Sequence, residues 1–303
     1  MDSKKYKPTL IGPSPPDHRD HKYKAVLAKK PAEFKSLPQK YNCPGYDTPE
    51  RDQGPWGTCA AQAAAFAHGH HHLVEYGEWL DFSPAFTYAH RQECRQDRSD
   101  VSEGMFMRDL VSIMYKRGCI SEGSLPYGKV SPNSLDIFKD NDTLKEYYSE
   151  SIKHRIKEYL EVDFEKEEIK AALYNNGPIL IAVPVWNYGK EMWKKEFEEQ
   201  SYKGGHAMVV TGYDEDGIFI RNSWGESWGD SGSCKMLWED IDCAWELWTT
   251  IDEKYDPENV RKMPERPTEC PKYTPPKWYE DKTLVVLLAL SVGALIYAFY
   301  IYS

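Results

Sequence analysis

The loop Gln53-Gly54-Pro55-Trp56-Gly57-Thr58-Cys59 and the helical run that follows it decide the fold of this sequence. The run is CAAQAAAFAHGHHHLVEY (59–76), and Thr58 is predicted to cap it. A cysteine in the first turn of a helix lies near unpaired N–H groups and the positive end of the helix dipole, and both lower the pKa of a thiol. Because a lone cysteine is more often buried and inert, this loop by itself leaves open whether Cys59 is a nucleophile.

Two further motifs lie in the second half of the chain. Gly204-Gly205-His206-Ala207-Met208 begins one predicted strand, and Arg221-Asn222-Ser223-Trp224-Gly225 ends the next. A thiol nucleophile needs a base to take its proton and a third group to orient that base. Cys59, His206 and Asn222 follow one another along the chain and can supply all three roles.

The expected elements divide the body of the chain into a helical half and a strand half. After the helix at 59–76, further helices are expected from Ser83-Pro84 onward, at 105–117 and at 164–176. Strands are expected at 178–185, 206–213, 217–223, 234–238 and 246–251, with the DEDG turn (214–217) forming a hairpin. Helices first and strands second predict an α+β protein, with a site in the cleft between its halves.

Charge and composition restrict the possible partners and predict a separate N-terminal segment. The chain of 303 residues has a net charge of -10, so no nucleic-acid partner is predicted. Residues 1–50 carry ten basic against six acidic side chains, which leaves an acidic body behind a basic arm. Residues 1–40 lack apolar periodicity and are expected to form this arm, followed by a folded domain at 41–251.

The C-terminal part predicts a membrane anchor. Residues 252–282 hold six prolines and are expected to form a semi-rigid stalk, and 284–302 is a run of nineteen residues without a charge. As a helix this run spans about 29 Å, roughly one bilayer core, although a buried C-terminal helix is the alternative. Lys277 and Lys282 precede it, so we expect a tail-anchored, single-pass membrane protein whose body faces the cytosol. A viral or virion membrane is the alternative location, and a reducing compartment makes a disulfide framework unexpected for the seven cysteines.

The sequence resembles the papain family of cysteine peptidases. QGPWGTCAAQAAAF, GGHAMVVTGY and IRNSWGESWGDSG look like the family's Cys, His and Asn blocks, and the 147 residues from Cys59 to His206 fit its usual spacing. The resemblance covers about residues 10–251. The segments GPSPPDHRDHKY and RGCISEGSLPYG are similar to compact members from bacteria and large DNA viruses. The resemblance implies a papain-like fold of a helical and a β-rich lobe.

The resemblance also implies a role for each motif residue. Cys59 would attack the scissile carbonyl, His206 would pair with it and protonate the leaving amine, and Asn222 would orient the imidazole. The side chain of Gln53 and the backbone N–H of Cys59 would form the oxyanion hole. Trp224 would either shield the His–Asn hydrogen bond from water or be an ordinary core residue. The family commonly has an aromatic residue after the nucleophile, where this chain has Ala60.

The expected function is that of a cysteine endopeptidase, which cleaves protein or peptide substrates through a thioester acyl-enzyme and without a cofactor. One alternative is a papain-fold amidase or transferase that passes the thioester to another nucleophile. The other is a catalytically silent, membrane-tethered binding module. Residues 8–24, rich in proline and charge, could be a short inhibitory arm over the cleft or a packing strap.

Two further groups of side chains have residue types that occur in binding sites. His68, His71 and His72 share a helix face at a spacing that can hold a metal, and His70 lies beside them. No cysteine or carboxylate of fitting spacing accompanies them, so we expect a polar, solvent-facing patch and no metal. The side-chain preference of the peptidase is not predicted, and three residues are candidates for the floor of its specificity pocket: Trp245, Glu246 and Trp248.

Overall fold

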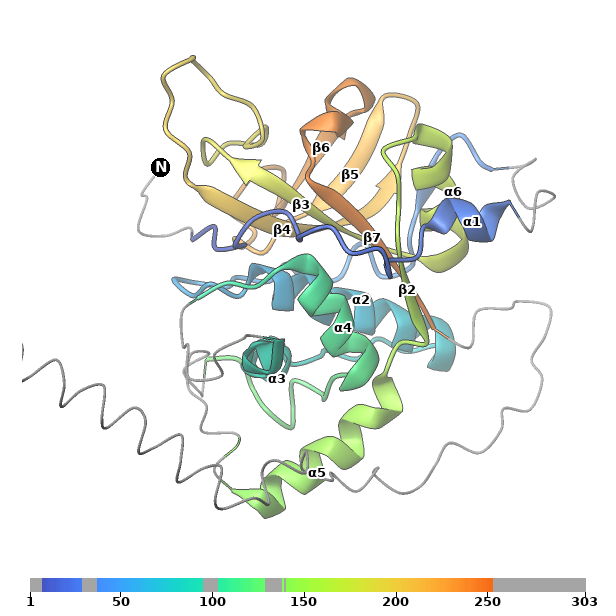
Figure 1. Ribbon diagram of the computed structural model, residues 1–303, viewed down its shortest axis with the longest axis vertical. Coiled ribbons are helices and arrows are strands. Elements are labelled where there is room, and N and C mark those ends of the chain that lie inside the picture. Colours follow the sequence, from blue (N-terminus) through green and yellow to red (C-terminus); the bar gives the residue numbers. More distant parts are fainter. Residues whose placement is uncertain (1–6, 29–36, 95–102, 129–137, 139, 253–303) are drawn as a thin grey trace, which may run out of the picture. The chain divides into compact units, whose positions relative to one another are not determined.

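The computed structural model describes residues 7–28, 37–94, 103–128, 138 and 140–252 (Figure 1). The predicted transmembrane helix at 284–302 lies outside these residues, as does the predicted stalk except for its first residue, Asp252. In the ranges that are described, no helix is both long enough and apolar enough to cross a membrane.

The helical lobe is built around the predicted helix that begins at Cys59. This helix, α2 (Cys59–Tyr76), packs on α3 (Pro84–Ala89) and α4 (Met107–Lys116). The lobe also contains α5 (Asn141–Ser151) and two short 3-10 helices, η2 (His90–Cys94) and η4 (Ile152–His154). In Figure 1, these helices lie below the sheet.

The second lobe is an antiparallel sheet with the strand order β2-β7-β3-β4-β5-β6, and β1 pairs with β4. The strands are β1 (Tyr41–Asn42), β2 (Glu158–Glu161), β3 (Ile179–Val185), β4 (Gly204–Tyr213), β5 (Gly217–Arg221), β6 (Ser233–Leu237) and β7 (Glu246–Ile251). The lobe also carries α1 (Tyr23–Leu27), α6 (Lys166–Asn176) and the 3-10 helix η5 (Trp238–Cys243). The predicted α+β division, helices first and strands second, is therefore confirmed.

Alternation along the strands gives the sheet two buried faces. Ile179, Ile181 and Val183 of β3 belong to the core under α6, whereas Leu180 and Ala182 belong to the core shared with α2. Successive side chains of a strand point to opposite faces, so one strand contributes to both cores. The two lobes thus share an apolar interface, and α2 lies against β4 there.

Local signals account for most element boundaries. The hydroxyl of Ser83 accepts a hydrogen bond from the N–H of Phe86 and caps α3, as predicted. The carboxylate of Asp214 accepts hydrogen bonds from Asp216 and Gly217 in the predicted hairpin turn. The predicted cap of α2 is wrong, because the Thr58 hydroxyl makes no capping bond and instead lies 2.7 Å from the hydroxyl of Tyr127.

Besides the 3-10 helices, four elements are not among those expected from the sequence. They are α1 inside the N-terminal arm, α5, and the strands β1 and β2. β2 is only four residues long and has one buried side chain, Leu160, so it offers little alternation to detect. It exists because Glu158–Glu161 pairs with β7 at the sheet edge, which is a long-range contact.

The histidine patch on α2 is not solvent-facing, contrary to the prediction. His68, His70 and His71 are only 3%, 4% and 8% exposed. His70 Nδ1 lies 2.9 Å from the carbonyl oxygen of Pro44, and His71 Nε2 lies 2.8 Å from the Thr250 hydroxyl. The helix is buried nearly all round between α3 and the sheet as far as His71, so these three histidines are enclosed, whereas His72 is half-buried.

Candidate active site

Cys59 is the first residue of α2 and is almost completely buried. Burial raises the pKa of its thiol, while hydrogen bonds from the N–H groups of Ala207 and Thr9 act in the opposite direction. Ala207 directly follows His206 in β4, so the structure brings the predicted nucleophile beside the residue next to the predicted base. The Thr9 contact belongs to the N-terminal arm.

His206 and Asn222 meet because β4 and β5 are antiparallel neighbours. His206 Nε2 lies 2.7 Å from Asn222 Oδ1, which also accepts the N–H of Ser223 at 2.7 Å. An amide oxygen can only accept, so Nε2 donates and Nδ1 of the neutral ring is left unprotonated. Burial lowers the pKa of His206 to about 4, and the bond to Asn222 acts in the opposite direction. Nδ1 is therefore a buried basic atom without a hydrogen-bond partner among the described residues.

Trp224 covers this pair. Its ring centroid lies 4.4 Å from that of His206, the two planes are tilted by 30°, and the Trp224 side chain is fully buried. The indole also packs edge-on against Trp228 in the core of the sheet lobe. Trp224 thus fits both of its predicted roles, since one side belongs to the core and the other side excludes water from His206.

Gln53 is fixed from both sides of the site. Its Oε1 accepts a hydrogen bond from the Ser223 hydroxyl at 2.7 Å, and its backbone N–H donates to the Ser223 carbonyl at 2.8 Å. These two bonds point Gln53 Nε2 away from Ser223, so that it donates to the carbonyls of Trp56 at 2.8 Å and Lys7 at 3.1 Å. Ser223, which the sequence analysis did not assign, therefore orients the predicted oxyanion donor.

The N-terminal arm runs between the two lobes at this point (Figure 1). The N–H of Leu10 donates to the carbonyl of Gly205 at 2.8 Å, and that of Ile11 donates to Met105 at 3.3 Å. A Cβ on Gly104 would lie 1.8 Å from the Thr9 carbonyl oxygen, so only glycine allows this approach. The arm is thus bonded to the loop before α4 on one side and to the start of β4 on the other.

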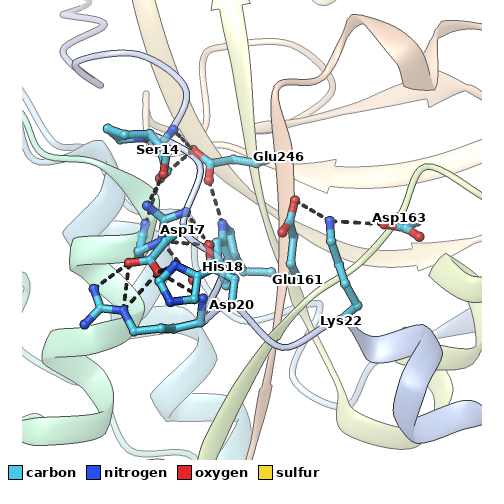
Figure 2. Close-up of polar contacts among 12 residues, drawn as sticks. Ser14, Asp17, His18, Asp20, Lys22, Glu161, Asp163 and Glu246 are labelled. Carbon is cyan, nitrogen blue, oxygen red and sulfur yellow. Dashed lines mark hydrogen bonds and ion pairs between the residues drawn. The ribbon is translucent and has the colours of Figure 1, made fainter.

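Further along the arm, polar contacts hold it to both lobes (Figure 2). The Ser14 hydroxyl donates to Glu246 Oε1 at 3.1 Å and accepts the N–H of Arg108 at 3.1 Å. Arg108 lies in the first turn of α4, whose own N-cap residue makes no side-chain bond, so Ser14 caps this helix from outside. The Arg108 guanidinium also pairs with Asp20, at 2.9 Å and 3.0 Å from Nε.

The three residues suggested for a specificity pocket lie together, in a hollow that the arm helps to line. Trp245, Glu246 and Trp248 form part of its wall, and Pro13, Ser14 and Pro16 of the arm form another part. Trp248 Nε1 donates to Glu246 Oε2 at 2.7 Å, and burial raises the pKa of Glu246. Their part in substrate selection remains a prediction.

The other described cysteines are packed in or against the hydrophobic cores. Cys43, Cys119 and Cys234 are buried, Cys94 and Cys243 are partly exposed, and no disulfide joins the cysteines that the structure describes. Over the same parts of the chain, no group of three or more His, Cys, Asp or Glu residues has the geometry to hold a metal ion.

The fold and the site define a two-lobed α+β protein with a cysteine, a histidine, an asparagine and a glutamine gathered where the lobes meet. The family model for papain family cysteine proteases matches residues 38–248, and the chain belongs to this family. It is a papain-like cysteine peptidase, a hydrolase.

Individual relatives agree with this assignment. The chain is 26% identical over 231 residues to an uncharacterized peptidase C1-like protein of Acanthamoeba polyphaga mimivirus, covering 69% of this chain and 71% of that protein. It is 25% identical over 214 residues to cysteine proteinase 1 of Entamoeba histolytica, covering 66% and 63%. The fold is similar to that of xylellain, a cysteine protease from Xylella fastidiosa, with a TM-score of 0.66 and 22% identity over 83% of this chain and 98% of that one.

Proposed function

We propose that the chain is an endopeptidase that uses Cys59, His206 and Asn222 as its catalytic triad and Gln53 as an oxyanion donor. The observation that carries the proposal is the bond between His206 Nε2 and Asn222 Oδ1. This bond leaves Nδ1 as the only site on the ring that can take a proton. His206 directly precedes Ala207, whose backbone contacts the Cys59 thiol.

The chemistry follows from these positions. The thiol proton of Cys59 passes to His206 Nδ1, and the thiolate adds to the scissile carbonyl carbon. The oxyanion accepts hydrogen bonds from Gln53 Nε2 and the Cys59 N–H. The C–N bond then breaks as the imidazolium gives its proton to the leaving amine, and water hydrolyses the thioester with the imidazole as base. No cofactor takes part.

We also propose that residues 7–19 inhibit the enzyme and that residues 20–27 are the strap. The arm uses the groups that catalysis needs, because Gln53 Nε2 donates to the Lys7 carbonyl and Thr9 contacts the thiol. The backbone of Thr9 donates a hydrogen bond to the Cys59 sulfur. Tyr23, by contrast, is buried in the core of the sheet lobe.

Burial by the arm has an electrostatic consequence as well. Desolvation raises the pKa of Cys59 and lowers that of His206, and both effects disfavour the thiolate–imidazolium pair. Removing residues 7–19 admits water, so the charged pair becomes more stable. The arm would then inhibit both by occupying the cleft and by keeping the reacting groups neutral.

The test is covalent labelling of the full chain under reducing conditions. An epoxide peptide probe should label wild type and fail to label Cys59→Ala and His206→Ala, as read by intact mass. Deletion of residues 1–19, which keeps the strap, should accelerate labelling. An unlabelled folded protein, with and without residues 1–19, would favour the silent binding module, and labelling without peptide hydrolysis would favour the amidase or transferase.

We further propose that the uncharged run 284–302 anchors the chain in a membrane with the peptidase domain in the cytosol. The proposal rests on the length and the flanking charges of this run. The full chain should stay with membranes after alkaline extraction, and the chain ending at residue 283 should not. Release of both by alkali would contradict the proposal.

A further inference from the structure

Arg221 ends β5 and directly precedes Asn222, yet its side chain is only 5% exposed. A buried guanidinium is stable only when its donors are satisfied, so the partners of each nitrogen show what the residue holds. Burial lowers the pKa of Arg221, and the carboxylate of Glu50 acts in the opposite direction.

Four hydrogen bonds and one ion pair join the Arg221 guanidinium to one short segment. Nε lies 2.9 Å from Glu50 Oε2. Nη1 donates to the Tyr46 carbonyl and the Thr48 hydroxyl, each at 3.0 Å. Nη2 donates to the carbonyls of Thr48 and Pro49. One side chain therefore fixes the backbone of residues 46–50, which lead into Gln53.

The segment that Arg221 fixes continues alongside the segment that follows Arg221. The N–H of Gly225 donates to the Arg51 carbonyl at 2.9 Å, and Asp52 forms a β-bridge with Trp224. These contacts are next to the two hydrogen bonds between Gln53 and Ser223 and join the same two segments. The oxyanion donor and the orienting asparagine thus lie on two segments that are joined at several points, with the guanidinium at one end.

Glu50 extends the connection to Asn222. Its Oε1 accepts a hydrogen bond from the Ser233 hydroxyl at 3.3 Å, and its side chain packs on Gly232, where a Cβ would lie 2.3 Å from Cγ of Glu50. The carbonyl of Gly232 accepts the backbone N–H of Asn222 at 3.0 Å. Glu50 therefore contacts the residue that holds the backbone of Asn222.

The guanidinium also contacts the helix of the nucleophile. Its central carbon lies 4.8 Å from the ring centroid of Phe66, which is on α2 two turns after Cys59. Arg221 thereby connects three parts of the site: the segment 46–50 that leads to Gln53, the end of β5 that precedes Asn222, and helix α2, which begins at Cys59.

We propose that Arg221, neutralised by Glu50, is a positioning residue that sets the place of the Gln53 donor relative to Asn222 and the nucleophile helix. The inference rests on the proposed function and adds to it. Arg221 touches no reacting atom, and it acts through the backbone of 46–50. Lysine offers three donors from one nitrogen, so it cannot reproduce four hydrogen bonds from two nitrogens together with an ion pair at a third.

The test separates positioning from simple stabilisation. In the full chain, Arg221→Met should lower kcat for peptide hydrolysis by about 10-fold to 100-fold with little change in KM, less than the full loss of an oxyanion donor. Affinity for a peptide aldehyde should fall in parallel, because its adduct places an oxygen in the oxyanion hole. The rate of thiol alkylation by iodoacetamide, which forms no oxyanion, should change less than about threefold.

Matched variants complete the experiment. Arg117→Met removes another arginine that binds a glutamate, Glu93 at 2.9 Å, and lies 5.2 Å from the ring centroid of Tyr148, but in the helical lobe. It should destabilise the protein without changing kcat or aldehyde affinity. Arg221→Lys should fall between wild type and Arg221→Met, and it provides the test if the methionine variant does not fold.

Two results would overturn the inference, and they differ from a failure of the proposed function. If Arg221→Lys or Arg221→Met loses only thermal stability, as Arg117→Met should, Arg221 is structural. If alkylation falls as much as kcat, the substitution disturbs the whole site and not the oxyanion donor. A wild-type chain that neither hydrolyses peptides nor labels at Cys59 would refute the proposed function itself and this inference with it.

Discussion

Substitution of His70 by asparagine should make the protein less sensitive to acid. His70 is 4% exposed, and its Nδ1 must donate to the Pro44 carbonyl because a carbonyl oxygen only accepts. Its Nε2 lies beside the backbone of Gly177, where a Cβ would be only 2.2 Å away. Burial lowers the pKa of His70 to about 3.

The magnitude follows from proton linkage. At pH values below about 6.5 the histidine is protonated in the unfolded chain and neutral in the folded protein, so stability falls as the pH falls. Between about pH 7.5 and about pH 5, one such residue costs about 2 kcal/mol of unfolding free energy. His68 and His71 are buried on the same helix with lowered pKa values, so the three together cost about 6 kcal/mol.

Carboxyl groups with raised pKa values act in the opposite direction. Burial raises the pKa of Glu246, and protonation of such groups in the folded state favours folding in acid. The pH dependence of the wild type alone is therefore a sum of opposing contributions. The difference between His70→Asn and wild type cancels these contributions and isolates one histidine.

The assay is urea unfolding followed by circular dichroism at several pH values from about 5 to about 7.5. Asparagine can still donate to the Pro44 carbonyl, but the variant should be less stable than wild type near neutral pH. Between about pH 7.5 and about pH 5, the difference in unfolding free energy between variant and wild type should shift in favour of the variant by about 2 kcal/mol. Ala65→Gly, in the same helix, should cost about 1 kcal/mol at every pH. If His70→Asn shows the same constant offset as Ala65→Gly, the reasoning is refuted.

Three further predictions concern the site. Ser14→Ala removes the bond to Glu246 and the cap on α4, so the arm should dissociate more easily and probe labelling of Cys59 should accelerate about tenfold; an unchanged rate would contradict the inhibitory arm. Gln53→Ala should lower kcat by about 10²–10³ with little effect on KM in steady-state assays, whereas Gln200→Ala, at a half-buried glutamine outside the site, should match wild type. Equal activity of the two variants would remove Gln53 from the mechanism. Asn222→Ala removes the hydrogen bond that raises the pKa of His206, so that pKa should fall further. In the pH profile of Cys59 alkylation, the alkaline limit of the thiolate–imidazolium pair should therefore move to lower pH. An unmoved profile would count against the triad.

The motifs themselves were visible in the sequence because they are local. A glycine loop before a helix places Cys59, and two strand ends place His206 and Asn222, so each side chain could be assigned to its element without knowing the fold. The elements followed for the same reason, since caps, hairpin turns and alternation act over a few residues. The short strand β2 was not predicted because it forms only by pairing with β7, which is far away in the sequence.

Burial could not be deduced in the same way. The histidines of α2 suggested a polar face, yet the helix lies between other helices and the sheet, and His68, His70 and His71 are enclosed. Thr58 has the right residue type for a cap but bonds with Tyr127, which is 69 residues away in the sequence. In both cases a tertiary contact overrode a local preference.

The sequence by itself thus determined the class of fold, the order of its elements and the chemistry of the motifs. Only the tertiary structure decided which residues orient those groups: Ser223 on Gln53, Ser14 on Glu246 and α4, and Arg221 on the segment before Gln53. The physical reason is that a side chain's reactivity depends on its type, which the sequence states, whereas its orientation and pKa depend on neighbours that only the folded chain brings within a few ångströms.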